Sequence, residues 1–140
     1  MVSSASHFSP PASTRVGLCR DNRLGRRFPY RSVLFQPHSA PLGIAFYDNW
    51  QFPAEYGDDA FVALHGSWNR AKRTGYKVVR LLMKAGQPTG VYKDFLTGFV
   101  ADPASVWGRP VDVALTKDGA LLVTDDEGGA IWRVTYRGPR

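Results

Sequence analysis

Residues 110–136 read PVDVALTKDGALLVTDDEGGAIWRVTY, a run in which three short apolar segments alternate with two turn sequences. The apolar segments are rich in β-branched and aromatic residues and are bounded by Gly, Pro and Asp, as short β-strands are. None of them has the i, i+3, i+4, i+7 spacing of an amphipathic helix. The run therefore predicts three consecutive antiparallel strands, at residues 110–115, 120–124 and 130–136.

The preceding residues show the same pattern with a fourth segment added, and predict strands at residues 43–47, 60–65, 76–83 and 92–99. Units of about 40 to 50 residues with four antiparallel strands are typical of β-propeller blades. The sequence thus predicts an all-β chain and a partial β-propeller of about two four-stranded antiparallel blades. One blade is complete, at about 43–99, and one has three strands, at about 109–136. Because blades need neighbours to close their core, we expect a C-terminal fragment of a larger ring or a chain that needs partners.

The positive charge of the chain lies near its beginning. The net charge is +6, but residues 1–31 hold six Arg and one Asp, whereas residues 32–140 hold twelve basic and eleven acidic residues. Residues 1–32 are therefore predicted to be a basic, disordered leader, and residues 33–140 to form the blades. The leader holds Cys19, the one cysteine of the chain, so no intrachain disulfide is expected.

A basic tail can bind nucleic acid, but a solvated leader is the favoured interpretation, because aromatic residues do not alternate with its arginines. We expect no nucleic-acid partner. We also expect no membrane span, and the leader lacks the apolar core of a secretory signal peptide.

Alternate loops of an antiparallel blade emerge at the same end of the sheet, because successive strands reverse direction. One end of this chain should therefore collect the loops at residues 36–41, 65–73, 105–109 and 125–128. These loops carry imidazole, indole and guanidinium side chains, namely His38, His65, Trp68, Arg70, Trp107 and Arg109. Their convergence predicts a binding site at one mouth of the propeller.

The candidates differ in strength. Arg109 is the strongest, because Gly108 and Pro110 give it a stiff mount at the entry of an innermost strand. His38 is as consistent with capping a turn as with touching a ligand, and Arg70 with a surface position alone. The remaining three have structural alternatives: a half-buried histidine for His65, and plugs between neighbouring blades for Trp68 and Trp107.

The carboxylate run Asp125-Asp126-Glu127 has the oxygen ligands that calcium prefers, but not the alternating spacing of an EF-hand loop. Acidic hairpin turns are common, so no metal ligand is assigned to it. The sequence contains no phosphate-binding loop, no HExxH and no GxSxG motif, and neither hydrolysis nor phosphoryl transfer is expected.

Three strings, HSAPLGIAFY (38–47), AFVALHGSWNR (60–70) and GRPVDVALTKDGALLVTDDEGGAIWRVTY (108–136), resemble the C-terminal blades of the glucose/sorbosone dehydrogenases. These are six-bladed quinoprotein propellers that use pyrroloquinoline quinone (PQQ), and the resemblance spans about residues 33–137. It implies oxidation of an aldose or sorbosone-type sugar at C1, with hydride transfer to the quinone, calcium polarising the quinone and a histidine as general base. It also implies a periplasmic parent protein.

Carried over by position, the resemblance places Arg109 on a cofactor-binding arginine, Arg70 in a loop that holds a cofactor-binding lysine, and His38 near the quinone. A second arginine of that family is replaced here by Val111. The catalytic histidine and the calcium loop of the family belong to earlier blades, so we expect this chain to be inactive alone. The alternative hypothesis is a non-catalytic propeller module that binds sugar or protein and self-associates through its open blade edges into a homo-oligomer.

Overall fold

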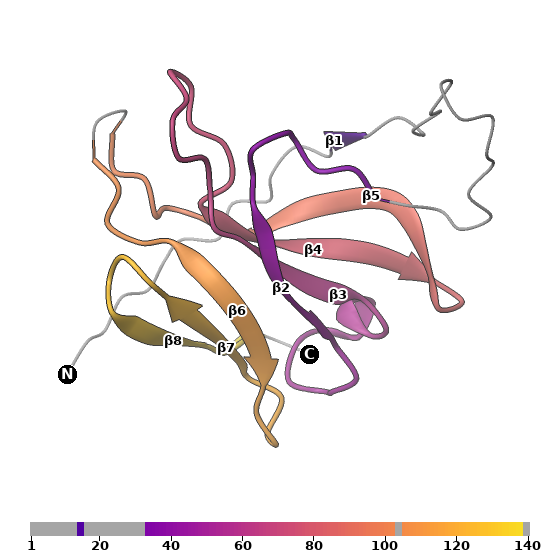
Figure 1. Ribbon diagram of the computed structural model, residues 1–140. Helices are drawn as coiled ribbons and strands as arrows, with labels where there is room; N and C mark the ends of the chain where they lie inside the picture. The colour runs from indigo at the N-terminus through magenta and orange to yellow at the C-terminus, as the bar shows by residue number, and fades with distance from the viewer. Residues whose placement is uncertain (1–13, 16–32, 103–104, 139–140) are drawn as a thin grey trace, which may run out of the picture.

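The computed structural model describes residues 14–15, 33–102 and 105–138, which form two antiparallel sheets and one short 3₁₀ turn (Figure 1). The first sheet has the strand order β1-β5-β4-β3-β2 and the second the order β6-β7-β8. The expected all-β class is confirmed. No helix in the described residues is long and apolar enough to cross a lipid bilayer. The elements are β1 (Thr14–Arg15), β2 (Pro41–Phe46), η1 (Ala54–Tyr56), β3 (Ala60–Leu64), β4 (Lys77–Lys84), β5 (Gln87–Leu96), β6 (Pro110–Leu115), β7 (Leu121–Asp125) and β8 (Ala130–Val134).

The strand β5 begins at Gln87, five residues earlier than the sequence pattern predicts. Ala85 and Gly86 have φ values of 49° and 71°, as the two central residues of a type I′ hairpin turn require. This tight turn pairs Lys84 directly with Gln87. Residues 87–91 therefore continue the ladder instead of forming a loop.

Two residues of the predicted leader form a strand: in β1, Thr14 pairs with Tyr92 and Arg15 with Val91, at the outer edge of β5. An outermost strand has unpaired backbone groups that can accept another strand. The expectation of disorder for the rest of residues 1–32 concerns positions outside the described residues.

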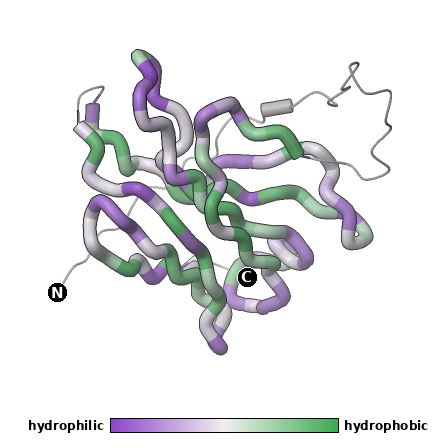
Figure 2. Tube along the Cα trace, in the orientation of Figure 1, coloured by the Kyte–Doolittle hydropathy of each residue, from purple (hydrophilic) through white to green (hydrophobic). Residues whose placement is uncertain are grey.

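The main hydrophobic core lies between the two sheets. It is formed by alternate residues of the facing strands, which point to the same side because side chains alternate along a strand. Figure 2 shows the hydrophobic residues concentrated along the strands, with hydrophilic residues at the loop tips. The buried members from the first sheet and its β2–β3 connection are Tyr47, Phe52, Tyr56, Phe61, Ala63 and Val78, and those from the second sheet are Val113, Leu121 and Val123.

The first sheet buries its opposite face as well. A second cluster contains Val62, Leu64, Val79 and Tyr92, and the segment before β2 packs on it through residues that include Phe35. The rings of Phe35 and Tyr92 are 5.2 Å apart. Both faces of β3 are therefore covered, which explains its continuous apolar sequence.

Beside the main core, a buried ion pair connects β4 to the loop that follows η1. The Arg80 side chain is only 8% exposed, and its Nε donates to Asp59 Oδ2. The other carboxylate oxygen of Asp59 accepts the Met83 N–H at 2.8 Å. The Arg80 guanidinium also lies over the ring of Tyr56, 3.7 Å from its centroid. This cluster closes the end of the first sheet that is remote from the candidate site.

The sheets meet most closely where β2 passes β6. A Cβ atom placed on Gly43 would lie 2.5 Å from the Asp112 Cα and 2.1 Å from its Oδ1. Any side chain at residue 43 therefore has to push the two strands apart.

Gly43→Ala is accordingly expected to lower the free energy of unfolding by about 1 to 3 kcal/mol, the usual cost of overpacking a core. Urea denaturation measures it. Leu42→Ala is the control, because Leu42 is exposed on the other face of β2 and its truncation should have a smaller effect. An unchanged midpoint in Gly43→Ala would contradict the close approach of β2 and β6.

Candidate functional site

The loops that were expected at one end of the sheets do meet there. The His65 N–H donates to the Ala40 carbonyl at 2.9 Å, and the Gly66 N–H to the Ser39 carbonyl at 3.0 Å. Within the second sheet, the Asp126 N–H donates to the Arg109 carbonyl at 3.1 Å. Across the seam between the sheets, the Nε2 atom of His65 lies 3.0 Å from Oδ2 of Asp126. These contacts confirm that the loops share one end.

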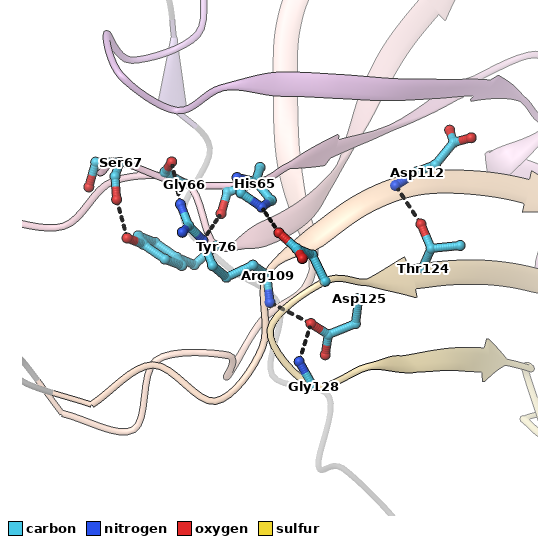
Figure 3. Close-up of polar contacts among 10 residues, drawn as sticks. His65, Gly66, Ser67, Tyr76, Arg109, Asp112, Thr124, Asp125 and Gly128 are labelled. Carbon is cyan, nitrogen blue, oxygen red and sulfur yellow. Dashed lines mark hydrogen bonds and ion pairs between the residues drawn. The ribbon is translucent and has the colours of Figure 1, made fainter. Parts of the chain in front are cut away.

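Tyr76 forms the floor of the site at the start of β4. It is buried, its φ of 56° is unusual for a non-glycine residue, and its hydroxyl donates to the Ser67 carbonyl (Figure 3). Gly66 lies against the ring, since a Cβ atom there would be 2.5 Å from a ring carbon. Gly66 has a φ of 104°, which glycine alone adopts readily. A glycine at residue 66 is thus needed both for the backbone and for the ring.

Two guanidinium groups lie close to this ring. The Cζ atom of Arg109 lies 5.5 Å from the ring centroid of Tyr76, and that of Arg73 lies 5.7 Å away. Arg109 also donates to the carbonyls of His65 and Gly66, over 3.5 and 3.4 Å (Figure 3). Among the described residues, no carboxylate forms an ion pair with Arg109. Its charge is therefore available to an anionic ligand.

The two arginines face a cleft of about 270 Å³ between the β3–β4 loop and the second sheet. The Trp68 side chain stands on its rim and is 88% exposed. The cleft is lined by Ser67, Trp68, Arg73, Tyr76, Val106, Arg109 and Glu127. An open, cationic cleft with an aromatic floor is suited to a planar anion.

Asp125 fixes the backbone of Arg109. Its buried carboxylate accepts the Arg109 N–H at 2.7 Å and the Gly128 N–H at 3.1 Å (Figure 3). It also accepts the Trp132 indole N–H at 2.9 Å. Burial by itself raises the pKa of Asp125, but these donors, together with the Glu127 N–H, outweigh it, and the pKa lies below the usual 3.8. Asp125 is thus an ionised anchor for Arg109.

The described residues contain no group of three or more His, Cys, Asp or Glu side chains that could hold a metal ion. Of the carboxylate run noted in the sequence, Asp125 is occupied by N–H donors, and Asp126 contacts His65 at 3.0 Å. The described part of the chain therefore does not offer a fitting calcium site.

The three residues proposed from the sequence as cofactor ligands occupy different places. Arg109 lines the cleft. Arg70 does not line it; its Nη1 donates to the Pro37 carbonyl at 3.1 Å and so ties the β3–β4 loop to the preceding turn. His38 is exposed in that turn, with a φ of 67°, and the Ser39 N–H closes the turn on the Gln36 carbonyl at 3.2 Å. Pro37 followed by a positive φ is typical of a type II turn. A cofactor contact for each of the three residues stays a prediction.

Sequence reasoning missed Arg73 and Tyr76. The segment from Arg70 to Arg73 holds three cations, and the sequence does not say which of them turns toward Arg109. The sequence did contain one signal of a special loop conformation, the glycine at residue 75. In the structure Gly75 has a φ of 83° and lies against Gly66 and the Ser39 carbonyl. Gly66 and Gly75 lie where the two ends of the β3–β4 loop come together, and Arg73 and Tyr76 are next to this point.

Trp68 and Trp107 have different surroundings in the structure. Trp107 lies between Phe99 and Trp132, with ring centroids at 5.3 and 5.7 Å, and its indole donates to the Gly98 carbonyl at 2.8 Å. This agrees with the plug alternative for Trp107. Trp68, in contrast, stands exposed at the cleft.

Comparison with known proteins relates this chain to a protein family. The sequence matches the TrAA12-like family over residues 5–137. The chain belongs to that family. The match begins in the segment for which the sequence strings gave no resemblance, and extends through both sheets. TrAA12-like relatives with solved structures are β-propellers, which confirms the expected partial propeller.

Two curated proteins are similar to parts of this chain. An uncharacterized protein of Borreliella burgdorferi is 48% identical over 100 residues, covering 71% of this chain and 26% of its own length. The pyrroloquinoline quinone-dependent pyranose dehydrogenase of Coprinopsis cinerea is 31% identical over 121 residues, covering 72% of this chain and 16% of its own length.

Two solved structures overlay on the chain. The holo form of the pyranose dehydrogenase PQQ domain from Coprinopsis cinerea has a TM-score of 0.60 at 29% identity, over 76% of this chain and 29% of its own. A family AA12 carbohydrate-active enzyme from Trichoderma reesei has a TM-score of 0.59 at 27% identity, over 72% of this chain and 26% of its own.

These matches confirm the quinoprotein relationship at a coarser level than expected, because they support the AA12 branch and not glucose/sorbosone dehydrogenase membership. The chain spans about a quarter, or less, of the length of the curated relatives that it matches.

Proposed function

We propose that this TrAA12-like chain is part of a PQQ-dependent sugar oxidoreductase and supplies the cationic side of its quinone site. The observation that carries the proposal is the pair of guanidinium groups, Arg109 and Arg73, which lie 5.5 and 5.7 Å from the ring centroid of the buried Tyr76 in an open cleft. The relationship to the Coprinopsis cinerea pyranose dehydrogenase supports it.

The described residues fit such a cofactor. PQQ is a planar tricarboxylate, and a guanidinium group binds a carboxylate through two parallel hydrogen bonds. Arg109 is held at its backbone by Asp125 and has long, weak contacts at its head, over 3.5 and 3.4 Å, that a carboxylate can replace. Arg109 and Arg73 would bind the carboxylates, and Tyr76 would keep both side chains in place.

When bound, PQQ would supply the hydride acceptor for oxidation of a sugar at C1. Arg109 and Arg73 would hold and orient the cofactor, and Glu127 and the exposed Trp68 also line the cleft. The substrate class we propose is a pyranose, with a sorbosone-type aldehyde sugar as the alternative from the sequence resemblance. Arg70, in the β3–β4 loop, and His38, in the turn before β2, would contribute from beside the cleft.

We also propose that the chain alone does not catalyse sugar oxidation. General base catalysis needs a group within reach of the sugar hydroxyl, and among the described residues neither His38 nor His65 lines the cleft. Addition of PQQ, calcium and a dye acceptor to the purified chain should give no sugar-dependent reduction. Robust turnover would contradict this.

The quinone site is tested by titrating the chain with PQQ and following tryptophan fluorescence. Arg109→Ala should weaken binding by roughly 10- to 100-fold, because a hydrogen bond to a charged group contributes about 1.5 to 3 kcal/mol. Arg133→Ala is the matched control, since Arg133 is a half-exposed arginine of β8 that does not line the cleft, and it should bind within about twofold of the wild type. Failure of the wild type to bind PQQ, or equal losses in both variants, would refute the assignment.

Self-association through the open blade edges stays a prediction. One observation favours it: Leu42, Ile44 and Phe46 form a stripe on β2 and are 59%, 53% and 60% exposed. Three copies of two blades would complete a six-bladed ring. Sedimentation equilibrium showing a stable trimer would support this, and a monomer would contradict it.

A further inference from the structure

His65 and Asp126 make a contact across the seam between the two sheets. His65 follows the last residue of β3, and Asp126 begins the loop between β7 and β8. The Nε2 atom of His65 lies 3.0 Å from Oδ2 of Asp126. A carboxylate only accepts hydrogen bonds, so the imidazole N–H donates. The His65 side chain is 18% exposed and that of Asp126 is 63% exposed.

The same two residues also contact Arg109, which closes a ring of three. The Asp126 N–H donates to the Arg109 carbonyl at 3.1 Å. At the other end of the arginine, the Nε donates to the His65 carbonyl over 3.5 Å. Asp126 therefore holds the backbone of Arg109, and His65 holds its guanidinium end. The His65–Asp126 hydrogen bond fixes how far apart these two contacts lie.

Of these contacts, the hydrogen bonds of the Arg109 guanidinium group are the weakest. Its hydrogen bonds of 3.5 and 3.4 Å are at the long limit, so they do not by themselves hold the guanidinium over Tyr76. The guanidinium group stays over Tyr76 only while the end of β3 keeps its position beside the start of β6. Charged side chains near the pair are Arg109 itself and Glu127, the residue after Asp126.

We propose that His65 and Asp126 are positioning residues, a latch across the seam that holds the Arg109 guanidinium over Tyr76 and so tunes the cleft for carboxylates. The ligand part of this inference rests on the proposed function, whereas the placement of Arg109 does not.

The placement is tested first without ligand. In ¹⁵N NMR spectra of the full chain, the Arg109 Nε–H signal is assigned by its loss in Arg109→Lys. Asp126→Ala and His65→Ala should each shift this signal and speed its exchange with water. His65→Gln, which keeps an N–H donor near the Nε2 position, should shift it less than His65→Ala does. The control is Asp118→Ala, which removes an exposed ion pair with Arg133 in the β6–β7 turn and should leave the signal in place.

The ligand part is tested by PQQ titration. His65→Ala and Asp126→Ala should each weaken binding by roughly 3- to 10-fold, and neither should weaken it further once Arg109 is Ala, because contacting residues that act together are not additive. A separate structural role would persist in the Arg109→Ala background.

The outcomes separate the two proposals. An unchanged Arg109 signal in Asp126→Ala, or a loss of affinity that persists in the double variant, overturns the latch. If the wild type binds no PQQ but the Arg109 signal responds to Asp126→Ala, the proposed function fails and the latch stands.

Discussion

Asp59→Ala is expected to lower the free energy of unfolding by about 3 to 5 kcal/mol, the cost of leaving a buried charge without its partner. The Arg80 side chain is 8% exposed and that of Asp59 is 6% exposed. Without the carboxylate, both the Arg80 Nε–H and the Met83 N–H lose their acceptor. Chemical denaturation monitored by circular dichroism measures the loss.

Glu55→Gln is the matched control for this substitution. Glu55 also contacts Arg80 through its side chain, at 3.2 Å, but is 71% exposed, so solvent screens the pair and the change should stay within about 1 kcal/mol. Equal losses in the two variants would mean that the Arg80–Asp59 pair is not the buried contact described here.

Asp125→Ala should be the second large destabilisation, at about 2 to 4 kcal/mol. The substitution leaves the Trp132 indole and the N–H groups of Arg109 and Gly128 without their acceptor, and unsatisfied buried donors are costly. It should also loosen Arg109 in the cleft. Asp48→Ala, at an exposed position, is the control and should change the unfolding midpoint little. A midpoint for Asp125→Ala equal to that of the control would contradict the anchoring role.

The ionisation of Asp125 predicts a pH dependence of stability. Its pKa is lower in the folded chain than the usual 3.8, because burial, which raises it, is outweighed by the N–H donors. The stabilisation is therefore fully present above pH 3.8 and is lost as the pH falls through the lower folded-state value. In denaturation series between pH 7 and pH 2, Asp125→Asn should lose part of the acid-induced decrease seen in the wild type. Parallel pH curves would contradict this.

The strand pattern was largely readable from the sequence, because it depends on short-range features. Side chains alternate along a strand, and turn residues mark where a strand ends, so β6 was predicted with its observed bounds. The start of β5 was not predicted, because Ala85 and Gly86 do not form one of the common turn dipeptides. Their positive φ values appear only in the folded chain.

The candidate site was predictable only in outline. The sequence by itself determined that the loops of Arg70 and Arg109 share one end, since strand direction alternates. Tertiary structure alone decided that Arg73, not Arg70, joins Arg109 over Tyr76, and that His65 meets Asp126. Loop residues with positive φ have no repeating pattern that reveals where they point, and His65 and Asp126 are 61 residues apart. Such contacts exist only after the two sheets have packed, because packing rather than local preference determines which side chains meet across the seam.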